Sequence, residues 1–407
     1  MGFSPCCLTE NIIVKTALVL EKFSISRGGA ERSTYELACA LADLGVDVTL
    51  LAGKINTEGL NNLPFRTQQL NVKGITRARQ WRSLERALTA HVSRNKYDVV
   101  HSISPLLAAD IYQPRGGSIL HSGNRHLRSY NKPAWAAIKR ATAWMNMGRR
   151  VRINSERTVC QRRDGPILAA LSEYVARQFR TDYGLPDERI RVIRNGVNTH
   201  RLRSEQAVSE GTKFRSLYDR KGDLALFLFA AENPRLKGLE WLIRSAQQAA
   251  KQRTAPLRDF RIMVIGSGKF KSYWSLARQL RLDQRILFMG STNHIPGLLQ
   301  MCDAVVLPTY NDACSRLVLE ALAVGKPAVT TTCNGASEFL KENKYGFVID
   351  HCDDVPALAE ALLHLCDRNQ QQQMSHAIEA DRLYEKVSMK RHALELLTLY
   401  ETGRVGF

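Results

Sequence analysis

The sequence predicts an α/β protein of two doubly wound, Rossmann-like domains that face each other across a cleft. In both halves of the chain, short apolar stretches alternate with helical patterns, a rhythm typical of parallel sheets with helices on both faces. The 407 residues are also too many for one ordinary core, and they fit two domains of roughly 200 residues. We place the domains at 1–193 and 194–382, and we expect a C-terminal helix within 383–407 to pack back toward the first domain.

The first half opens with an apolar stretch over 12–20, which carries Lys15 and is too short to span a membrane. A loop over 24–29 leads into a helix that runs to about Asp43. Leu37 and Leu41 share one face of this helix, and Gly45 ends it. The pattern then predicts a strand over 46–51, a helix over 79–92 and a strand over 97–100.

The second half repeats this rhythm. Its short apolar stretches predict buried strands over 224–229, 260–265, 285–289, 304–307 and 328–331. Residues 189–198 and the polar stretch 199–212 form the predicted hinge, and a helical pattern runs from about 377 to 400. Ligands of doubly wound sheets bind at the carboxyl ends of the strands, so we expect the active site in the cleft between the domains.

The chain is strongly basic, with a formal net charge of +19. Between Arg115 and Arg163 there are twelve Lys or Arg residues and one acid, Glu156. Such an excess indicates an anionic partner. The sequence has no recognised nucleic-acid module, so we expect a membrane surface or a polyanionic glycan rather than nucleic acid. The nine cysteines are scattered without the spacing of a zinc site, which is typical of reduced thiols in a cytoplasmic protein.

The segment 311–320 follows a predicted strand and opens a helix. Asp312 belongs to the loop, and Glu320 lies just over one turn into the helix. A helix amino terminus offers free N–H groups and partial positive charge to a diphosphate, and Ser315 and Arg316 stand at that position. The two acids could then accept hydrogen bonds from sugar hydroxyls on either side of the diphosphate. Taken alone, the segment fits equally well two solvated acids beside an ordinary turn.

Four further segments accompany this one in a fixed order: Arg27-Gly28-Gly29-Ala30-Glu31-Arg32, Leu171-Ser172-Glu173-Tyr174, Val192-Ile193-Arg194-Asn195-Gly196-Val197-Asn198 and Glu232-Asn233-Pro234-Arg235-Leu236-Lys237-Gly238. With all five, nearly the whole chain resembles the retaining GT-B glycosyltransferases of group 1, and among them the lipopolysaccharide core glucosyltransferases. The family carries two acids separated by seven residues where this chain has Asp312 and Glu320.

The resemblance implies a role for each matching residue. Asp312 would hold the hydroxyls of the donor sugar and Glu320 those of the ribose, while Lys237 would neutralise the diphosphate as it leaves. Gly28 and Gly29 would let the backbone approach the donor closely. The implied donor-binding residues are Gly28, Gly29, Arg235, Lys237, Ser315, Arg316 and Glu320.

The chain departs from the family pattern in two places. Asp312 stands where Glu is usual, which shortens the reach to the sugar, and Ala230-Ala231 stands where many members have an Arg that Arg235 would replace. The family's first-domain His is also missing, and the comparable region offers Asp110, Arg115 and His121. We name Asp110, Asp312 and Lys237 as catalytic candidates. Asp110, like Arg115 and His121, also fits a structural or acceptor-binding role. The leaving phosphate itself could instead take the acceptor proton.

The basic region 132–152 reads as one helix, with Trp135, Ile138 and Trp144 on an apolar face. Such a helix suits the interface of an anionic membrane. It also fits a first-domain helix whose Trp residues face the core and whose Arg residues are solvated. The predicted acceptor or membrane face comprises Arg115, His121, Arg125, Lys139, Arg140, Arg149 and Arg150.

The sequence thus predicts a retaining, metal-independent hexosyltransferase that needs no cofactor beyond its nucleotide sugar, most simply UDP-glucose. The acceptor would be a hydroxyl of a membrane-associated glycan such as lipopolysaccharide core, reached from the cytoplasmic face of the cell membrane. A mannosyltransferase of the same fold that uses a GDP-sugar is the first alternative. A non-catalytic basic protein that docks on membranes or nucleic acid is the second.

Overall fold

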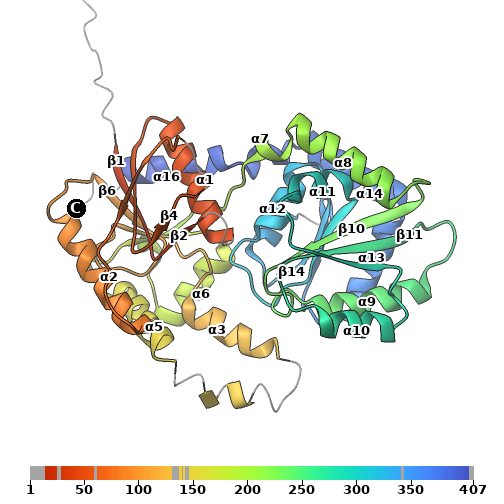
Figure 1. The fold of residues 1–407 in the computed structure, drawn as a ribbon, viewed down its shortest axis with the longest axis horizontal. Coiled ribbons are helices and arrows are strands. Elements are labelled where there is room, and N and C mark those ends of the chain that lie inside the picture. Colours follow the sequence, from red (N-terminus) through yellow and green to blue (C-terminus); the bar gives the residue numbers. More distant parts are fainter. Residues whose placement is uncertain are drawn as a thin grey trace, which may run out of the picture.

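The computed structural model describes residues 14–24, 29–58, 62–130, 137–139, 141–142, 146–340 and 343–402. These residues form two lobes, each built around a parallel sheet flanked by helices (Figure 1). The predicted pair of doubly wound domains is therefore confirmed.

The first domain contains a sheet of seven parallel strands. In spatial order they are β5 (Arg66–Gln69), β3 (Asp47–Ala52), β1 (Lys15–Leu20), β6 (Val99–Ser102), β7 (Ile111–Tyr112), β8 (Ile167–Ala170) and β9 (Ile190–Val192). Two short strands, β2 (Phe23–Ser24) and β4 (Ile55–Asn56), pair separately. The main helices are α1 (Gly29–Asp43), α2 (Arg77–Val92), α3 (Ile119–Arg128), α5 (Met147–Gln161) and α6 (Glu173–Tyr183).

The second domain contains six parallel strands in the order typical of a dinucleotide-binding sheet, with its first strand near the centre. They are β12 (Ile286–Gly290), β11 (Asp259–Ile265), β10 (Leu224–Ala230), β13 (Ala304–Leu307), β14 (Ala328–Thr331) and β15 (Gly346–Ile349). Its helices are α7 (Thr199–Leu202), α8 (Glu205–Tyr218), α9 (Leu239–Gln252), α10 (Lys271–Gln279), α11 (Ile295–Met301), α12 (Arg316–Ala323), α13 (Val355–Cys366), α14 (Arg368–Ala380) and α15 (Leu383–Lys386).

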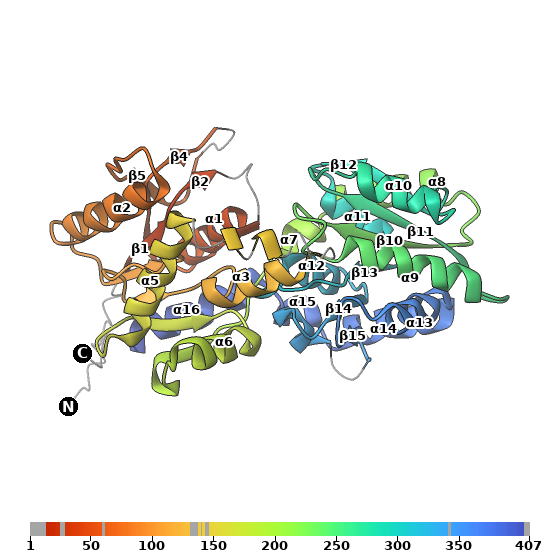
Figure 2. The same cartoon turned by 90° about the horizontal axis from the view of Figure 1, so that it is seen from below.

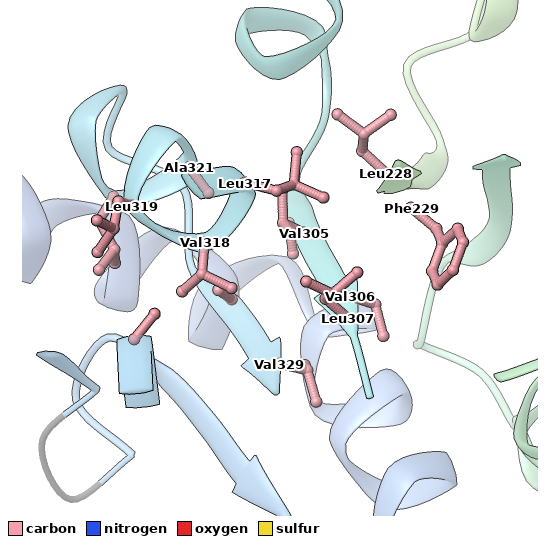
Figure 3. Packing of buried hydrophobic residues seen from close by; sticks show 14 of the residues in the cluster. Leu228, Phe229, Val305, Val306, Leu307, Leu317, Val318, Leu319, Ala321 and Val329 are labelled. Atoms are coloured by element: carbon pink, nitrogen blue, oxygen red, sulfur yellow. The ribbon is translucent and has the colours of Figure 1, made fainter. Parts of the chain in front are cut away.

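Helix α12 is fixed by its apolar face. Leu317, Val318 and Ala321 pack toward Val305 and Val329 of the neighbouring strands (Figure 3), and all five side chains are buried. Full burial of each larger aliphatic side chain stabilises the fold by about 1.5–3 kcal/mol. This packing holds the amino terminus of α12 at the carboxyl end of the sheet, where it faces the first domain.

The chain returns to the first domain at its end. The last helix, α16 (Met389–Thr402), packs beside α1 and lies in the first lobe in both views (Figures 1 and 2). Its Leu396 and Tyr400 are fully buried in the core of that domain. The two crossings of the chain lie side by side, because Val197 pairs with Ser388.

Two helical predictions were wrong. The pattern over 377–400 is not one helix, because Arg382 takes a left-handed conformation (φ 51°) between α14 and α15. The basic region 132–152 is not one helix either. Asn146 interrupts it and starts α5, accepting a hydrogen bond from the backbone N–H of Arg149. Among the described residues, no helix is both long and apolar enough to cross a membrane.

Candidate active site

A cavity of about 1460 Å³ lies between the two domains. Its walls include Arg115 and His126 from the first domain and Lys237, Asn311 and Asp312 from the second. The second-domain residues follow β10 and β13, so they stand at the carboxyl ends of neighbouring parallel strands. The cleft is therefore where a doubly wound protein is expected to bind its ligand.

Lys237 and Asp312 form an ion pair on the second-domain side of the cleft. Both side chains are partly exposed, by 21% and 18%. Their two loops are pressed together: the backbone N–H of Tyr310 donates to the Leu236 carbonyl at 2.9 Å. A Cβ on Gly238, which has φ 77°, would lie 2.0 Å from the carbonyl oxygen of Pro308. Only glycine fits there, and this close approach directs Lys237 toward Asp312.

The amino terminus of α12 opens beside Asp312. Ser315 is its N-cap residue, but the serine side chain makes no capping hydrogen bond. The backbone N–H of Ser315 itself donates to Asn334 Oδ1 at 3.0 Å. No backbone partner of the next three N–H groups, those of Arg316, Leu317 and Val318, is found among the described residues. These donors, with the helix dipole, can receive an anion.

The Arg316 side chain does not point to that anion position. Its Nη2 contacts Glu36 on α1 at 2.9 Å and Glu320 at 3.1 Å. All three side chains are largely buried, with exposed fractions of 13%, 5% and 9%. Burial opposes the charge on Arg316, yet Glu320 and Glu36 together hold its pKa above the ordinary value. Arg316 therefore ties the two domains together, and Gly29 lies against its stem, since a Cβ there would be 3.8 Å from Arg316 Cδ.

Arg235 also bridges the domains rather than joining Lys237. Its guanidinium lies 3.4 Å from the centre of the Tyr130 ring and 3.1 Å from His126 Nε2, both from the α3 side of the first domain. A guanidinium over an aromatic face is attracted by the negative face of the ring. Burial and the nearby Arg235 lower the pKa of His126, which keeps its ring neutral at pH 7.

Asp110 lies away from this cleft, so the prediction that it is a catalytic residue was wrong. It directly precedes β7, so it stands at the amino end of the strand, and its carboxylate accepts the Val100 N–H at 2.7 Å. Arg115 does line the cleft. It donates to Asn195 Oδ1 at 3.4 Å, while its Nε and Nη2 are buried and have no partner among the described residues. Burial and neighbouring Arg316 lower the pKa of Arg115 to about 10, so it stays charged.

His121 and Arg125 face the second domain rather than a membrane. Arg125 Nε lies 3.4 Å from His121 Nε2. The Tyr174 hydroxyl lies 3.3 Å from the same nitrogen and donates to Asn311 Oδ1 at 2.7 Å. These contacts attach α3 and α6 to the loop that carries Asp312.

Among the described residues, the other predicted cations, Lys139, Arg149 and Arg150, belong to the basic region of the first domain. Lys139 and Arg149 line the cleft, and Arg149 packs on α3 where only Gly123 leaves room for its guanidinium. Arg150 is exposed on α5. Gly28 and Arg140, together with Trp135 and Trp144, lie outside the described residues. No group of three or more His, Cys, Asp or Glu side chains that could hold a metal ion is found in the described part of the chain.

Sequence reasoning missed three polar residues: Tyr130, which lines the cleft, and the buried Glu36 and Asn334, which contact the predicted site residues Arg316 and Ser315. Glu36 interrupts the buried stripe of α1, and a charged residue among Leu37, Ala38 and Leu41 was the available signal. Asn334 Oδ1 accepts hydrogen bonds from the backbone N–H groups of Ser315 and Ala336. The Tyr130 ring makes a cation–π contact with Arg235. No sequence feature marks either of the last two.

Two family models match the chain. One, described as Glycosyltransferase Family 4, matches residues 27–201, and the other, described as Glycosyl transferases group 1, matches residues 224–368. The chain belongs to the group 1 glycosyltransferases. The resemblance read from the five sequence segments is therefore confirmed at the level of the family.

Curated relatives of this group 1 glycosyltransferase align over only part of their length. An uncharacterised glycosyltransferase of Methanocaldococcus jannaschii is 28% identical over 44% of this chain and 45% of the relative. The lipopolysaccharide glucosyltransferase WaaG of Escherichia coli is 24% identical over 48% of this chain and 51% of the relative. The chain thus spans about half the length of the curated relatives it matches.

Solved structures share the fold of this group 1 glycosyltransferase over almost its whole length. The crystal structure of WaaG superposes with a TM-score of 0.71 and 19% identity, covering 91% of this chain and 96% of WaaG. HepE of Anabaena, in complex with UDP and glucose, superposes with a TM-score of 0.68 and 17% identity, covering 95% and 99% of the two chains. At these identities the likeness extends to the fold alone.

Proposed function

We propose that this protein transfers a hexose from a UDP-sugar, most simply UDP-glucose, to a hydroxyl of a membrane-associated glycan such as lipopolysaccharide core, with retention at the anomeric carbon. The observation that carries the proposal is the Lys237–Asp312 pair beside the open amino terminus of α12. A cation, a carboxylate and free N–H groups thus converge where a sugar diphosphate needs a counter-charge and a hydroxyl acceptor.

The proposed reaction occurs on one face of the donor sugar. The bond from the anomeric carbon to the diphosphate oxygen breaks, and the acceptor oxygen bonds to the same carbon. The acceptor proton passes to the leaving phosphate, because Asp110 is not in the cleft. Negative charge grows on that phosphate in the transition state, and Lys237 and the α12 N–H groups are placed to stabilise it.

Donor binding would exchange partners within the site. The Lys237 ammonium would turn from Asp312 to the diphosphate, which frees the carboxylate to accept hydroxyls of the donor sugar. Glu320 already shares Arg316 with Glu36, so it could accept ribose hydroxyls while Glu36 keeps Arg316 paired. With this charge neutralisation supplied by protein groups, we expect transfer to continue in EDTA.

The basic side of the first domain would face the acceptor membrane from the cytoplasm. Ile75, Ile138 and Met147 are exposed there by 93%, 52% and 55%, and each has a cation within three positions in the chain, namely Arg77, Lys139 and Arg150. Exposed apolar side chains among cations are typical of a surface that inserts shallowly into an anionic leaflet. WaaG, a lipopolysaccharide glucosyltransferase by name, supports a glycan acceptor of this class.

The nucleotide is tested by thermal unfolding with UDP, GDP and ADP, since only a bound nucleotide raises the melting temperature. We expect UDP to give the largest rise. A larger rise with GDP would favour the mannosyltransferase alternative, and no rise with any nucleotide would contradict the proposal.

Chemistry is tested by hydrolysis of UDP-glucose without acceptor. Lys237→Ala and Asp312→Ala should each lower the rate by about 10²–10³-fold, the usual cost of losing one electrostatic stabiliser. The matched controls Lys221→Ala and Asp283→Ala alter exposed second-domain residues and should leave the rate unchanged. Equal rates in all four variants would contradict the roles given to Lys237 and Asp312, and no hydrolysis by the wild type would support a non-catalytic docking protein instead.

A further inference from the structure

A second cavity, of about 520 Å³, is lined in part by Thr309 and Tyr310 of the loop that carries Asp312. The first domain contributes Arg125 and Arg128 from α3, and the second contributes residues after β13, β14 and β15. The full lining is Arg125, Arg128, Trp241, Thr309, Tyr310, Cys333, His351, Cys352 and Asp353. None of these residues lines the larger cleft, so the two cavities are separate.

Two aromatic rings form a fixed wall of this cavity. The Trp241 indole N–H donates to the Tyr310 hydroxyl at 2.7 Å. The Tyr310 backbone is held by the Leu236 carbonyl, one residue before Lys237. Burial raises the pKa of Tyr310, so its hydroxyl remains protonated and can keep its place in this network. Such a wall offers a flat apolar surface to one face of a sugar ring, and the pocket's few polar groups can fix the orientation of the ring.

The polar groups favour an anion. Arg125 and Arg128 lie three residues apart on α3 and so project from the same side of the helix. Neither has a carboxylate within salt-bridge distance among the described residues. A guanidinium is suited to a phosphate group, which it can bind through two parallel N–H donors. From the second domain, exposed Asp353 also lines the cavity and can accept hydrogen bonds from sugar hydroxyls.

We propose that this cavity binds a phosphorylated sugar, with the phosphate on Arg125 and Arg128 and the ring against Trp241 and Tyr310. The idea that this phosphorylated sugar is part of the acceptor glycan rests on the proposed function. The idea that the cavity binds a phosphorylated sugar does not. The ligand would contact both domains and would lie against Thr309 and Tyr310 of the loop that carries Asp312. It would therefore favour the domain arrangement in which it touches both sides.

The binding is tested by isothermal titration of the full chain with three probes: glucose 6-phosphate, glucose and inorganic phosphate. We expect glucose 6-phosphate to bind at least tenfold more tightly than either part alone. Arg128→Gln should weaken it about tenfold or more, as expected for loss of a charged hydrogen bond, and Trp241→Leu should weaken it as well. Arg177→Gln, an exposed change on α6 outside both cavities, should have no effect.

Three results would overturn the inference: no heat with glucose 6-phosphate, equal affinity for inorganic phosphate, or unchanged affinity in Arg128→Gln. Arg128 is exposed, so its replacement leaves the core intact. Titration with UDP on the same samples separates the two proposals. UDP binding without sugar phosphate binding would overturn this inference alone, and the converse would overturn the proposed donor.

Discussion

Two buried histidines should make the protein sensitive to mild acid. His101 and His392 are fully buried between the first sheet and α16. Burial, together with the nearby charge of Arg115, lowers the pKa of His101 to about 3. Burial, Arg115 and Arg391 lower the pKa of His392 well below its usual value. Both rings are therefore neutral in the folded protein, whereas they bind protons in the unfolded chain once the pH falls below about 6.5.

The sign and the size of the effect follow from this difference. The unfolded state binds more protons below pH 6.5, so the free energy of unfolding falls as the pH falls toward the folded pKa. At pH 5, about 1.5 units below the unfolded value, linkage of about 1.4 kcal/mol per unit gives a loss of about 2 kcal/mol for each histidine. The pair should therefore cost about 4 kcal/mol between pH 7.5 and pH 5, a large part of the stability of an ordinary domain.

The assay compares guanidinium unfolding at pH 7.5 and pH 5, followed by circular dichroism, for the wild type and for His101→Asn with His392→Asn. Asn keeps a donor near the Arg194 carbonyl, which His392 Nδ1 contacts at 2.7 Å. The double variant will be less stable at pH 7.5, but it should lose about 4 kcal/mol less than the wild type on going to pH 5. The exposed change His200→Asn serves as control. Parallel pH profiles for all three proteins would refute the argument.

Three further predictions concern the cleft and the basic side of the first domain. Glu36→Gln should destabilise the protein by about 3 kcal/mol in thermal unfolding, because it removes one acid from a buried ion cluster, whereas the exposed Glu205→Gln should be neutral. Gly238→Ala should abolish UDP-glucose hydrolysis, since a Cβ would meet a backbone oxygen at 2.0 Å. Gly222→Ala, at φ 72° with open space around it, should cost only the conformational strain of about 1–2 kcal/mol. Ile75→Ser should reduce sedimentation with anionic vesicles and leave hydrolysis in solution unchanged, and equal sedimentation would contradict the proposed membrane face.

The elements that the sequence predicts best are those buried on both faces. Apolar stretches over 304–307 and 328–331 coincide with β13 and β14, because a strand covered by helices on both sides must be apolar throughout. The loops that carry Lys237 and Asp312 were located for the same reason, since each follows such a strand. In contrast, β7 has two residues and β9 three, which is too short for periodicity to appear.

The side-chain partners across the cleft could not be predicted. Glu36 and Arg316 are 280 positions apart in the chain, and only the docking of the two domains brings them together. Arg235 was predicted to bind phosphate because it lies two residues before Lys237, and its contact with the Tyr130 ring of the first domain could not be foreseen. Asp110 was misplaced because composition does not reveal which end of a strand a residue will occupy.

The late return of α16 sets an order for synthesis on the ribosome. Leu396 and Tyr400 complete the core of the first domain, but they emerge roughly 200 residues after β9, a delay of about 10–40 s at ordinary rates of translation. Until then α1 lacks its neighbour, and the buried surface of the sheet stays partly uncovered. The domain that begins first along the chain is therefore the second to finish folding.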